Sequence, residues 1–323
     1  MKHRVFIDGR AGTTGLRIEE YLGRRDDIEL IDIDEAKRKD IDERLAMIEE
    51  ADVAFLCLPD EGSREIVAAL DGRAAAAGAD SAAARARIID ASTAHRTSDG
   101  WVYGLPELAP EQRGLIGGAN RVAMAGCHAT GFILLVRPLV DAGIAPPDYP
   151  FAAHSVTGYS GGGKQMIAQY EEVTDALLGA PRQYALAQGH KHLPEMAKLS
   201  GISFAPHFSP HVSNYFAGME VVVPLHRRQL AQGAEAEDVR RALEERYGGE
   251  QLVRVAGEGE NPEGGFLSAG ALAGRNDMEI FVLGNAERIL LTARYDNLGK
   301  GASGSGVQCM NLMLGLPETD GLL

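Results

Sequence analysis

The chain has 323 residues, of which 45% are hydrophobic and 24% charged, and this predicts a globular protein of about two domains. Its 46 acidic and 32 basic residues give a net charge of −14, which argues against nucleic acid or an anionic membrane as the main partner. No segment reaches the ~18 consecutive apolar residues of a membrane span and the N-terminus lacks a signal-peptide pattern, so we expect a cytoplasmic protein.

The N-terminal part alternates short apolar runs with helical patterns. Strands are expected at residues 5–7, 28–33, 52–58 and 88–89. An amphipathic helix is predicted from about Thr14 to Leu22, and this alternation predicts βαβ units and a parallel sheet. The alanine-rich segment 73–87 is expected to be a solvent-side helix or loop without a role in chemistry.

The pattern changes after about residue 126. A buried helix is predicted at 132–140, a turn or linker at 146–150, and a last helix at 305–314. Longer strands, expected to form one mixed or antiparallel sheet, are predicted at 151–156, 219–225, 279–283 and 289–295.

A glycine-rich turn follows the first strand and opens the first helix. It reads Gly9-Arg10-Ala11-Gly12-Thr13-Thr14-Gly15. Glycines let the backbone turn sharply and approach a pyrophosphate, which then faces the free N–H groups of the helix N-terminus. The turn therefore predicts a dinucleotide site, although a tight turn without a ligand has the same pattern.

The choice of dinucleotide depends on the end of the second strand. An acidic residue there suits the ribose hydroxyls of NAD, and a basic group suits the 2′-phosphate of NADP. Asp32 and Asp34 lie near that end, and Lys37-Arg38-Lys39 follows closely. A charge run of this kind is commonly a solvated helix face, so these residues leave the choice open.

Of three widely spaced cysteines, Cys127 has the surroundings of a nucleophile. It lies in Gly126-Cys127-His128-Ala129-Thr130-Gly131, at the start of an apolar helix, where the helix dipole lowers the pKa of a thiol. Backbone N–H groups at such a helix start can stabilise an oxyanion. For Cys57 and Cys309 we favour simple packing, which is also the alternative for Cys127.

The segment His190-Lys191-His192-Leu193-Pro194-Glu195 enters a helix. A loop at a helix start presents a general acid or base easily, so one histidine is a candidate proton donor. The alternatives are a capping or core histidine and a zinc site, but no third metal ligand has convincing spacing, so no metal is expected.

Three other loops carry candidate binding residues. The glycine-rich loop 156–164 ends in Lys164 and suits an anion. The loop 90–96 follows a parallel strand and carries Arg96, a candidate clamp for a carboxylate or phosphate. The loop 296–304 precedes the last helix and carries an amide, Asn297, that suits nicotinamide.

Taken together, the chain resembles the shorter form of the N-acetyl-gamma-glutamyl-phosphate reductases of arginine biosynthesis. The resemblance rests on residues 6–15, 90–96, 126–131, 159–164, 190–195 and 296–304. The motif around Cys127 departs from the usual one: the family cysteine commonly follows Pro-Gly and precedes an aromatic residue, whereas Ala125-Gly126 precede it here and His128 follows. Asp32 stands where short-form members tend to have serine.

The resemblance implies an α/β fold and a role for each matching residue. It implies a Rossmann-type domain at 1–126 and 299–323, and an α+β catalytic and oligomerisation domain of the glyceraldehyde-3-phosphate dehydrogenase-like type at 127–298. Cys127 is implied as the nucleophile, with His192 favoured over His190 as the acid/base. NADP, favoured over NAD, is implied to contact Gly9, Ala11, Gly12, Thr13, Thr14, Gly15, Pro59, Ser92, Asn297 and Gly301. An acyl-phosphate substrate is implied to contact Arg96, Lys164, Tyr184 and Glu195.

The resemblance also implies a homodimer or homotetramer. The expected chemistry is attack of the Cys127 thiolate on N-acetyl-gamma-glutamyl phosphate, reduction of the resulting thioester, and release of the semialdehyde. Two alternatives remain: a related enzyme such as an aspartate-semialdehyde dehydrogenase, and a dinucleotide-sensing regulator that has lost catalysis.

Overall fold

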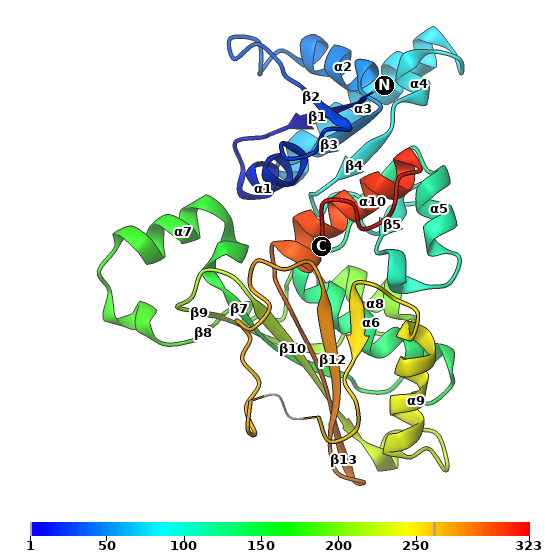
Figure 1. Cartoon of the computed structure of the whole chain (residues 1–323), viewed down its shortest axis with the longest axis vertical. Helices are drawn as coiled ribbons and strands as arrows, with labels where there is room; N and C mark the ends of the chain where they lie inside the picture. The colour runs from blue at the N-terminus through cyan, green and yellow to red at the C-terminus, as the bar shows by residue number, and fades with distance from the viewer. Residues whose placement is uncertain (1, 261–262) are drawn as a thin grey trace. The chain divides into compact units, whose positions relative to one another are not determined.

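The computed structural model describes residues 2–260 and 263–323. The chain folds as two compact units: Met1–Ala125 together with Ala302–Leu323, and Gly126–Gly301. Each unit has its own sheet, and the elements of both are labelled in Figure 1.

The first unit is built on a six-stranded parallel sheet of order β2-β1-β3-β4-β6-β5. Its strands are β1 (His3–Asp8), β2 (Ile28–Ile31), β3 (Val53–Leu56), β4 (Ile88–Asp90), β5 (Val102–Gly104) and β6 (Arg121–Met124). The chain passes from β1 outward to β2 and then back across to β3, so the strand order reverses beside β1. The carboxyl ends of the strands at such a reversal form the crevice in which open α/β sheets bind ligands.

Within the described residues, six helices accompany this sheet. They are α1 (Thr13–Leu22), α2 (Ile41–Glu50), α3 (Asp60–Ala77), α4 (Ala82–Arg85), α5 (Gln112–Gly118) and α10 (Gly304–Leu314). A short 3-10 helix, Pro106–Leu108, also belongs to this unit, and a π-helical turn, Gly299–Ser303, spans the point where the chain passes from the second unit back to the first. The strands predicted at 5–7, 28–33, 52–58 and 88–89 are present as β1 to β4 with somewhat different ends, and the two predicted helices are present as α1 and α10, each beginning one residue earlier than expected.

The expectation for the alanine-rich segment 73–87 is partly wrong. Its first residues extend α3 and its last turn is α4, as Figure 1 shows, but Ala83 and Ala86 are buried in the hydrophobic core beside Leu45 and Ile66. Alanine is small enough to let α4 lie close against α3 and α2, so the segment is part of the core as well as of the surface.

The second unit contains a seven-stranded mixed sheet of order β11-β12-β13-β10-β7-β9-β8. Its strands are β7 (Ala152–Gly158), β8 (Arg182–Gln183), β9 (His207–Ser213), β10 (Met219–His226), β11 (Val253–Val255), β12 (Met278–Gly284) and β13 (Arg288–Tyr295). Its helices are α6 (Cys127–Asp141), α7 (Gly163–Glu172), α8 (Leu193–Ser200) and α9 (Ala236–Tyr247), and its 3-10 helices are Tyr159–Gly162, Ala176–Gly179 and Arg227–Gln229. The predicted mixed sheet and the parallel-sheet Rossmann-type unit together confirm the α/β class.

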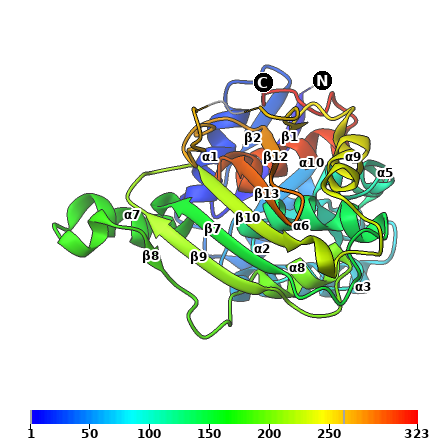
Figure 2. The ribbon, with the colours of Figure 1, turned by 90° about the horizontal axis from the view of Figure 1, so that it is seen from below.

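Helix α6 lies against β10 and β13, and α8 packs on α6 (Figure 1). Helix α6 is almost entirely buried from His128 to Leu139, which explains its apolar run at 132–136. Pairing of Met219 with both Tyr295 and Thr157 sets the ends of β13, β10 and β7 side by side. By contrast, α7 has no buried residue and extends beyond the end of β7 (Figure 2).

Candidate active site

Cys127 is the first residue of α6. Gly126 precedes it with extended backbone (φ −77°, ψ 145°) and caps the helix without a side-chain hydrogen bond. The first amides of a helix have no intrahelical acceptor, and amides of this kind can stabilise an oxyanion. Cys127 is partly exposed, whereas Cys309 is buried. Burial raises the pKa of the Cys57 thiol, which disfavours its thiolate form.

Tyr295 holds the backbone of Cys127. Its hydroxyl donates to the carbonyl oxygen of Cys127 at 2.6 Å and accepts the N–H of Gly131 at 3.0 Å, so it stands between the two groups that would bond in a regular helix. Residue 131 has to be glycine, because a Cβ there would lie 2.6 Å from this hydroxyl. Burial and nearby Cys127 raise the pKa of Tyr295 well above 10, so the phenol keeps the proton that it donates.

The buried carboxylate of Glu195 connects α8 to the start of α6. Its Oε2 accepts the N–H of Gly126 at 3.1 Å, and its Oε1 lies 4.0 Å from Nε2 of His192. Glu195 is only 1% exposed. The structure therefore gives Glu195 a contact with Gly126, the residue before Cys127, whereas its contact with substrate remains a prediction.

His190 and His192 lie in the same cluster. The N–H of His192 donates to Nδ1 of His190 at 3.1 Å, so a neutral His190 carries its proton on Nε2. The ring centroids of the two histidines are 4.6 Å apart, and that of His190 is 5.7 Å from Tyr184. The structure thus brings together the two candidate acid/base residues, His190 and His192, and the candidate substrate-binding residue Tyr184.

His128 joins this cluster through two short hydrogen bonds. Its Nδ1 lies 2.7 Å from the Ser155 hydroxyl and its Nε2 lies 2.6 Å from the Tyr184 hydroxyl. Burial, with a smaller effect of nearby His190, lowers the pKa of His128 to about 3, so this imidazole is neutral at physiological pH. Burial, reinforced by Cys127, raises the pKa of Tyr184, which keeps its proton.

The glycine turn of the first unit has the close contacts that its sequence predicts. A Cβ on Gly9 would lie 2.3 Å from the carbonyl oxygen of Cys57, and φ of Gly9 is +79°. A Cβ on Gly15 would lie 2.8 Å from backbone atoms of Arg10, so only glycine lets α1 approach the turn. Among the described residues, the buried hydroxyl of Thr13 has no hydrogen-bond partner, which fits a ligand oxygen at this helix start.

A pocket of about 750 Å³ adjoins this turn. It is lined by residues of the turn and of the segment after β2, among them Gly9, Arg10, Ala11, Asp32, Arg38 and Lys39. Arg10 binds Asp32 at 2.5 Å and also Glu19, so the Asp32 carboxylate is partly neutralised. Lys39 is exposed and has no ion pair within the described part of the chain.

The other predicted residues of the first unit lie at carboxyl ends of its strands. Pro59 caps α3 after β3. The Ser92 hydroxyl donates to Asp90 at 2.8 Å and accepts the N–H of Ala94, so it is occupied within its own loop. Arg96 ends the same loop and its guanidinium lies 3.4 Å from the Ala91 carbonyl.

The remaining predictions fall in the second unit. The Asn297 amide accepts the N–H of Gly218 at 2.9 Å and donates to Ser160 at 3.0 Å, so among the described residues one of its two amide hydrogens has no acceptor. Gly301 adjoins Cys127, since a Cβ there would lie 3.0 Å from Cβ of Cys127. Lys164 is exposed at the start of α7.

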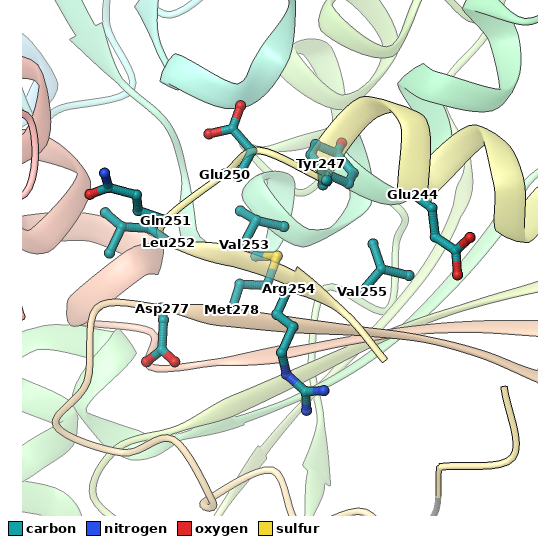
Figure 3. A pocket seen from close by; sticks show the side chains of 11 residues that line it. Glu244, Tyr247, Glu250, Gln251, Leu252, Val253, Arg254, Val255, Asp277 and Met278 are labelled. Atoms are coloured by element: carbon teal, nitrogen blue, oxygen red, sulfur yellow. The ribbon is translucent and has the colours of Figure 1, made fainter. Parts of the chain in front are cut away.

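A second hollow of about 410 Å³ lies between α9 and β11 (Figure 3). Its lining includes Glu244, Glu250 and Asp277, and its cation, Arg254, binds Glu260 and Glu279 at 2.9 and 2.6 Å. This acidic lining is unfavourable for an acyl phosphate. In the described residues, no three His, Cys, Asp or Glu side chains are grouped for a metal, and no helix is long and apolar enough to span a membrane.

Comparison with known families covers both units. Residues 4–115 match the model of the semialdehyde dehydrogenase NAD binding domain, and residues 127–297 match that of the semialdehyde dehydrogenase dimerisation domain. N-acetyl-gamma-glutamyl-phosphate reductase 2 of Nostoc sp. is 45% identical over 332 residues, covering 99% of each chain. The reductase of Brucella ovis is 45% identical over 319 residues, covering 98% of this chain and 100% of its own.

The chain belongs to the N-acetyl-gamma-glutamyl-phosphate reductases of the semialdehyde dehydrogenase family. The predicted resemblance is therefore confirmed, and the first unit of this family member is a nicotinamide-dinucleotide-binding domain. Solved structures extend the likeness in fold: aspartate semialdehyde dehydrogenase II from Vibrio cholerae has a TM-score of 0.70 at 18% identity, covering 97% of this chain and 99% of its own.

Sequence reasoning missed three residues of this family member's site. No local motif indicates Tyr295, Ser155 or the structural role of His128, because their partners are distant along the chain. Tyr295 lies 164 residues from Gly131. His128 lies 27 residues from Ser155 and 56 residues from Tyr184. The indication in the sequence was His128 itself, a polar residue at the start of a largely apolar helix.

Proposed function

We propose that this chain reduces N-acetyl-gamma-glutamyl phosphate to N-acetylglutamate semialdehyde and phosphate, with NADPH as reductant and Cys127 as nucleophile. The observation that carries the proposal is the construction around Cys127. Its helix start is held by Tyr295 on one side and, through Gly126, by Glu195 on the other, with the histidine cluster in the same unit.

The first step forms one bond and breaks another. The Cys127 thiolate attacks the acyl carbon, the C–S bond forms, the bond to the phosphate oxygen breaks, and phosphate leaves. Amides at the start of α6 stabilise the negative charge that develops on the acyl oxygen. A free carboxylate would resist reduction, whereas the thioester on Cys127 is activated for it.

The second step returns the enzyme to its starting state. The thioester carbon would accept the hydride that a nicotinamide dinucleotide supplies when bound. His192 protonates the resulting oxygen and takes the proton back as the C–S bond breaks, which releases the aldehyde and the Cys127 thiolate. We keep His192 as the acid/base because it is buried and its Nε2 lies 4.0 Å from Glu195; His190 is the alternative.

The residues of the glycine turn fit the dinucleotide. Gly9 and Gly15 leave room for a pyrophosphate, and the buried Thr13 hydroxyl can donate to one of its oxygens. Two features support NADP over NAD: Arg10 neutralises Asp32, and Lys39 offers an ammonium without an ion pair in the part of the chain that is described. Arg96, Lys164 and Tyr184 are proposed to bind the acyl phosphate.

The proposal includes a homo-oligomer and a cytoplasmic location. The match of residues 127–297 to a dimerisation domain supports self-association, either as a dimer or as a tetramer, and light scattering would give the mass. The three cysteines are free, which agrees with a reducing compartment.

The test is a steady-state assay run with two substrates and two cofactors. We expect turnover of N-acetyl-gamma-glutamyl phosphate with NADPH to exceed turnover with NADH, and to exceed turnover of aspartyl phosphate with either cofactor. Lys39→Ala should raise KM for NADPH and leave KM for NADH unchanged. Preference for aspartyl phosphate would refute the proposed substrate, and equal use of NADH would refute the proposed cofactor.

A further inference from the structure

Ser155, His128 and Tyr184 form a continuous hydrogen-bonded chain beside the nucleophile. Ser155 lies in β7 and faces α6, His128 follows Cys127 in α6, and Tyr184 follows β8. The two hydrogen bonds are 2.7 and 2.6 Å long, and both involve ring nitrogens of one imidazole. Ser155 is fully buried and His128 is 2% exposed.

The direction of this chain follows from the surroundings of Ser155. Among the described residues, its hydroxyl has one hydrogen-bond partner, Nδ1 of His128. A buried hydroxyl whose proton has no acceptor costs about 1–3 kcal/mol, so Ser155 donates and Nδ1 accepts. The proton of the neutral imidazole is then on Nε2, which donates to the oxygen of Tyr184. The proton of Tyr184 must therefore point away from His128.

The backbone around Tyr184 is fixed. Its N–H donates to the Pro210 carbonyl at 3.1 Å, continuing the pairing of β8 with β9. Gln188 binds both the N–H and the carbonyl of Phe208, at 2.9 and 2.7 Å. Ala185 and Gln188 both have positive φ, of 53° and 56°, a strained conformation that recurs near functional residues.

We propose that His128 is a positioning residue, held as its Nε2–H tautomer by Ser155, which makes Tyr184 a hydrogen-bond donor to an oxygen of the acyl-phosphate substrate. With the opposite tautomer, the Tyr184 hydroxyl would donate its proton to His128 and present only lone pairs to the substrate. Those lone pairs would repel a phosphate or carboxylate. This inference rests on the proposed function for the identity of the substrate, but not for the direction of the hydrogen-bonded chain.

The arrangement is expected to persist across the working pH range. Titratable neighbours of His128 are Tyr184, His190, His192 and Cys127. The low pKa of His128, about 3, keeps its ring neutral while its neighbours change charge. The tautomer is thus set by Ser155 rather than by pH.

The first test does not depend on activity. Nitrogen and carbon NMR shifts of labelled histidine in the full-length protein distinguish the two neutral tautomers, and a His128→Phe sample assigns the signal. We expect Nε2–H at pH 7, and in Ser155→Ala a mixture of tautomers. A wild-type His128 with its proton on Nδ1, or a charged His128, would overturn the inference.

The second test separates this role from simple packing. Tyr184→Phe should raise KM for the acyl phosphate about 10- to 100-fold, as expected for a lost hydrogen bond to a charged group, with a smaller change in kcat. Ser155→Ala should raise KM in the same direction, and His128→Phe combined with Tyr184→Phe should be no worse than Tyr184→Phe alone. The exposed Ser203→Ala is the matched control and should change nothing.

Failure of the proposed function and failure of the positioning role of His128 would give different results. Wild-type protein that does not turn over the acyl phosphate refutes the proposed function, while the NMR result still decides the tautomer. Additive effects of His128→Phe and Tyr184→Phe on KM, or an unchanged KM in Ser155→Ala, refute the positioning role even if the wild-type enzyme is active. If His128→Phe does not fold, Ser155→Ala and the wild-type spectrum still test it.

Discussion

At the scale of single residues, the geometry of Cys127 depends on side chains from distant parts of the sequence. Tyr295 comes from the end of the last strand and Glu195 from the helix after the histidine motif, and both bind backbone groups next to the thiol. Because these contacts are made to the backbone, the thiol of Cys127 is not needed to anchor the helix start and can change partners during the proposed reaction.

Tyr295→Phe tests this support. The substitution leaves the buried carbonyl of Cys127 and N–H of Gly131 without the hydroxyl, so we expect a loss of about 1–3 kcal/mol in the free energy of unfolding and a fall in kcat. Tyr149→Phe is the matched control, because Tyr149 accepts the N–H of His226 away from Cys127. Urea unfolding measures the free energy of unfolding and steady-state kinetics measures kcat for each variant. Equal losses of kcat in Tyr295→Phe and Tyr149→Phe would contradict the role assigned to Tyr295.

His128 predicts a pH dependence of stability. Its pKa is about 3 in the folded chain against 6.5 for an ordinary histidine, so the unfolded chain takes up a proton below pH 6.5 that the folded chain does not. The free energy of unfolding should therefore fall by up to about 1.4 kcal/mol per pH unit from pH 6.5 toward 3. Urea titrations of wild type and His128→Phe should show a shallower slope in the variant; parallel slopes would argue against a neutral buried imidazole.

At the scale of elements, glycines decide how closely α1 approaches β1 and β3. Gly15→Ala would put a Cβ 2.8 Å from the backbone of Arg10, so the turn must shift and dinucleotide affinity should fall at least about tenfold. Gly72→Ala is a suitable control, because a Cβ there meets nothing within 4 Å inside α3 and should stabilise the helix by up to about 1 kcal/mol. Fluorescence titration with NADPH measures the affinity, and thermal unfolding measures the stability of each variant. Unchanged affinity in Gly15→Ala would contradict the proposed pyrophosphate site.

Elements with a clear period could be predicted from the sequence, but the contacts between them could not. The strands and α6 have continuous or alternating apolar patterns, and the glycine turn has its own spacing. Burial of Ala83 and Ala86 could not be foreseen, because an alanine-rich helix has the same sequence whether it faces solvent or packs on α2. The motif residues of the candidate site could be predicted from the sequence. The contacts of Ser155 and Tyr295 could not, because they depend on how β7, β13 and α6 pack together.

At the scale of the whole molecule, the first unit is made from two separate segments of chain. Helix α10 lies after the second unit in the sequence, yet Val307, Cys309 and Met310 are fully buried in the first. A truncation after residue 301 should therefore leave the first unit unable to fold and abolish dinucleotide binding. Removing the exposed Leu323 alone should do neither. Limited proteolysis and NADPH titration decide the point; a truncated chain that still binds NADPH would contradict it.

The central claim is that Cys127 becomes acylated during the reaction. Intact-mass spectrometry of protein mixed with N-acetyl-gamma-glutamyl phosphate, without dinucleotide, measures this directly. We predict one added acyl group, mapped to the peptide that contains Cys127, released as aldehyde when NADPH is supplied and not formed in Cys127→Ala. An unmodified wild-type protein, or an adduct that persists in Cys127→Ala, would contradict the mechanism.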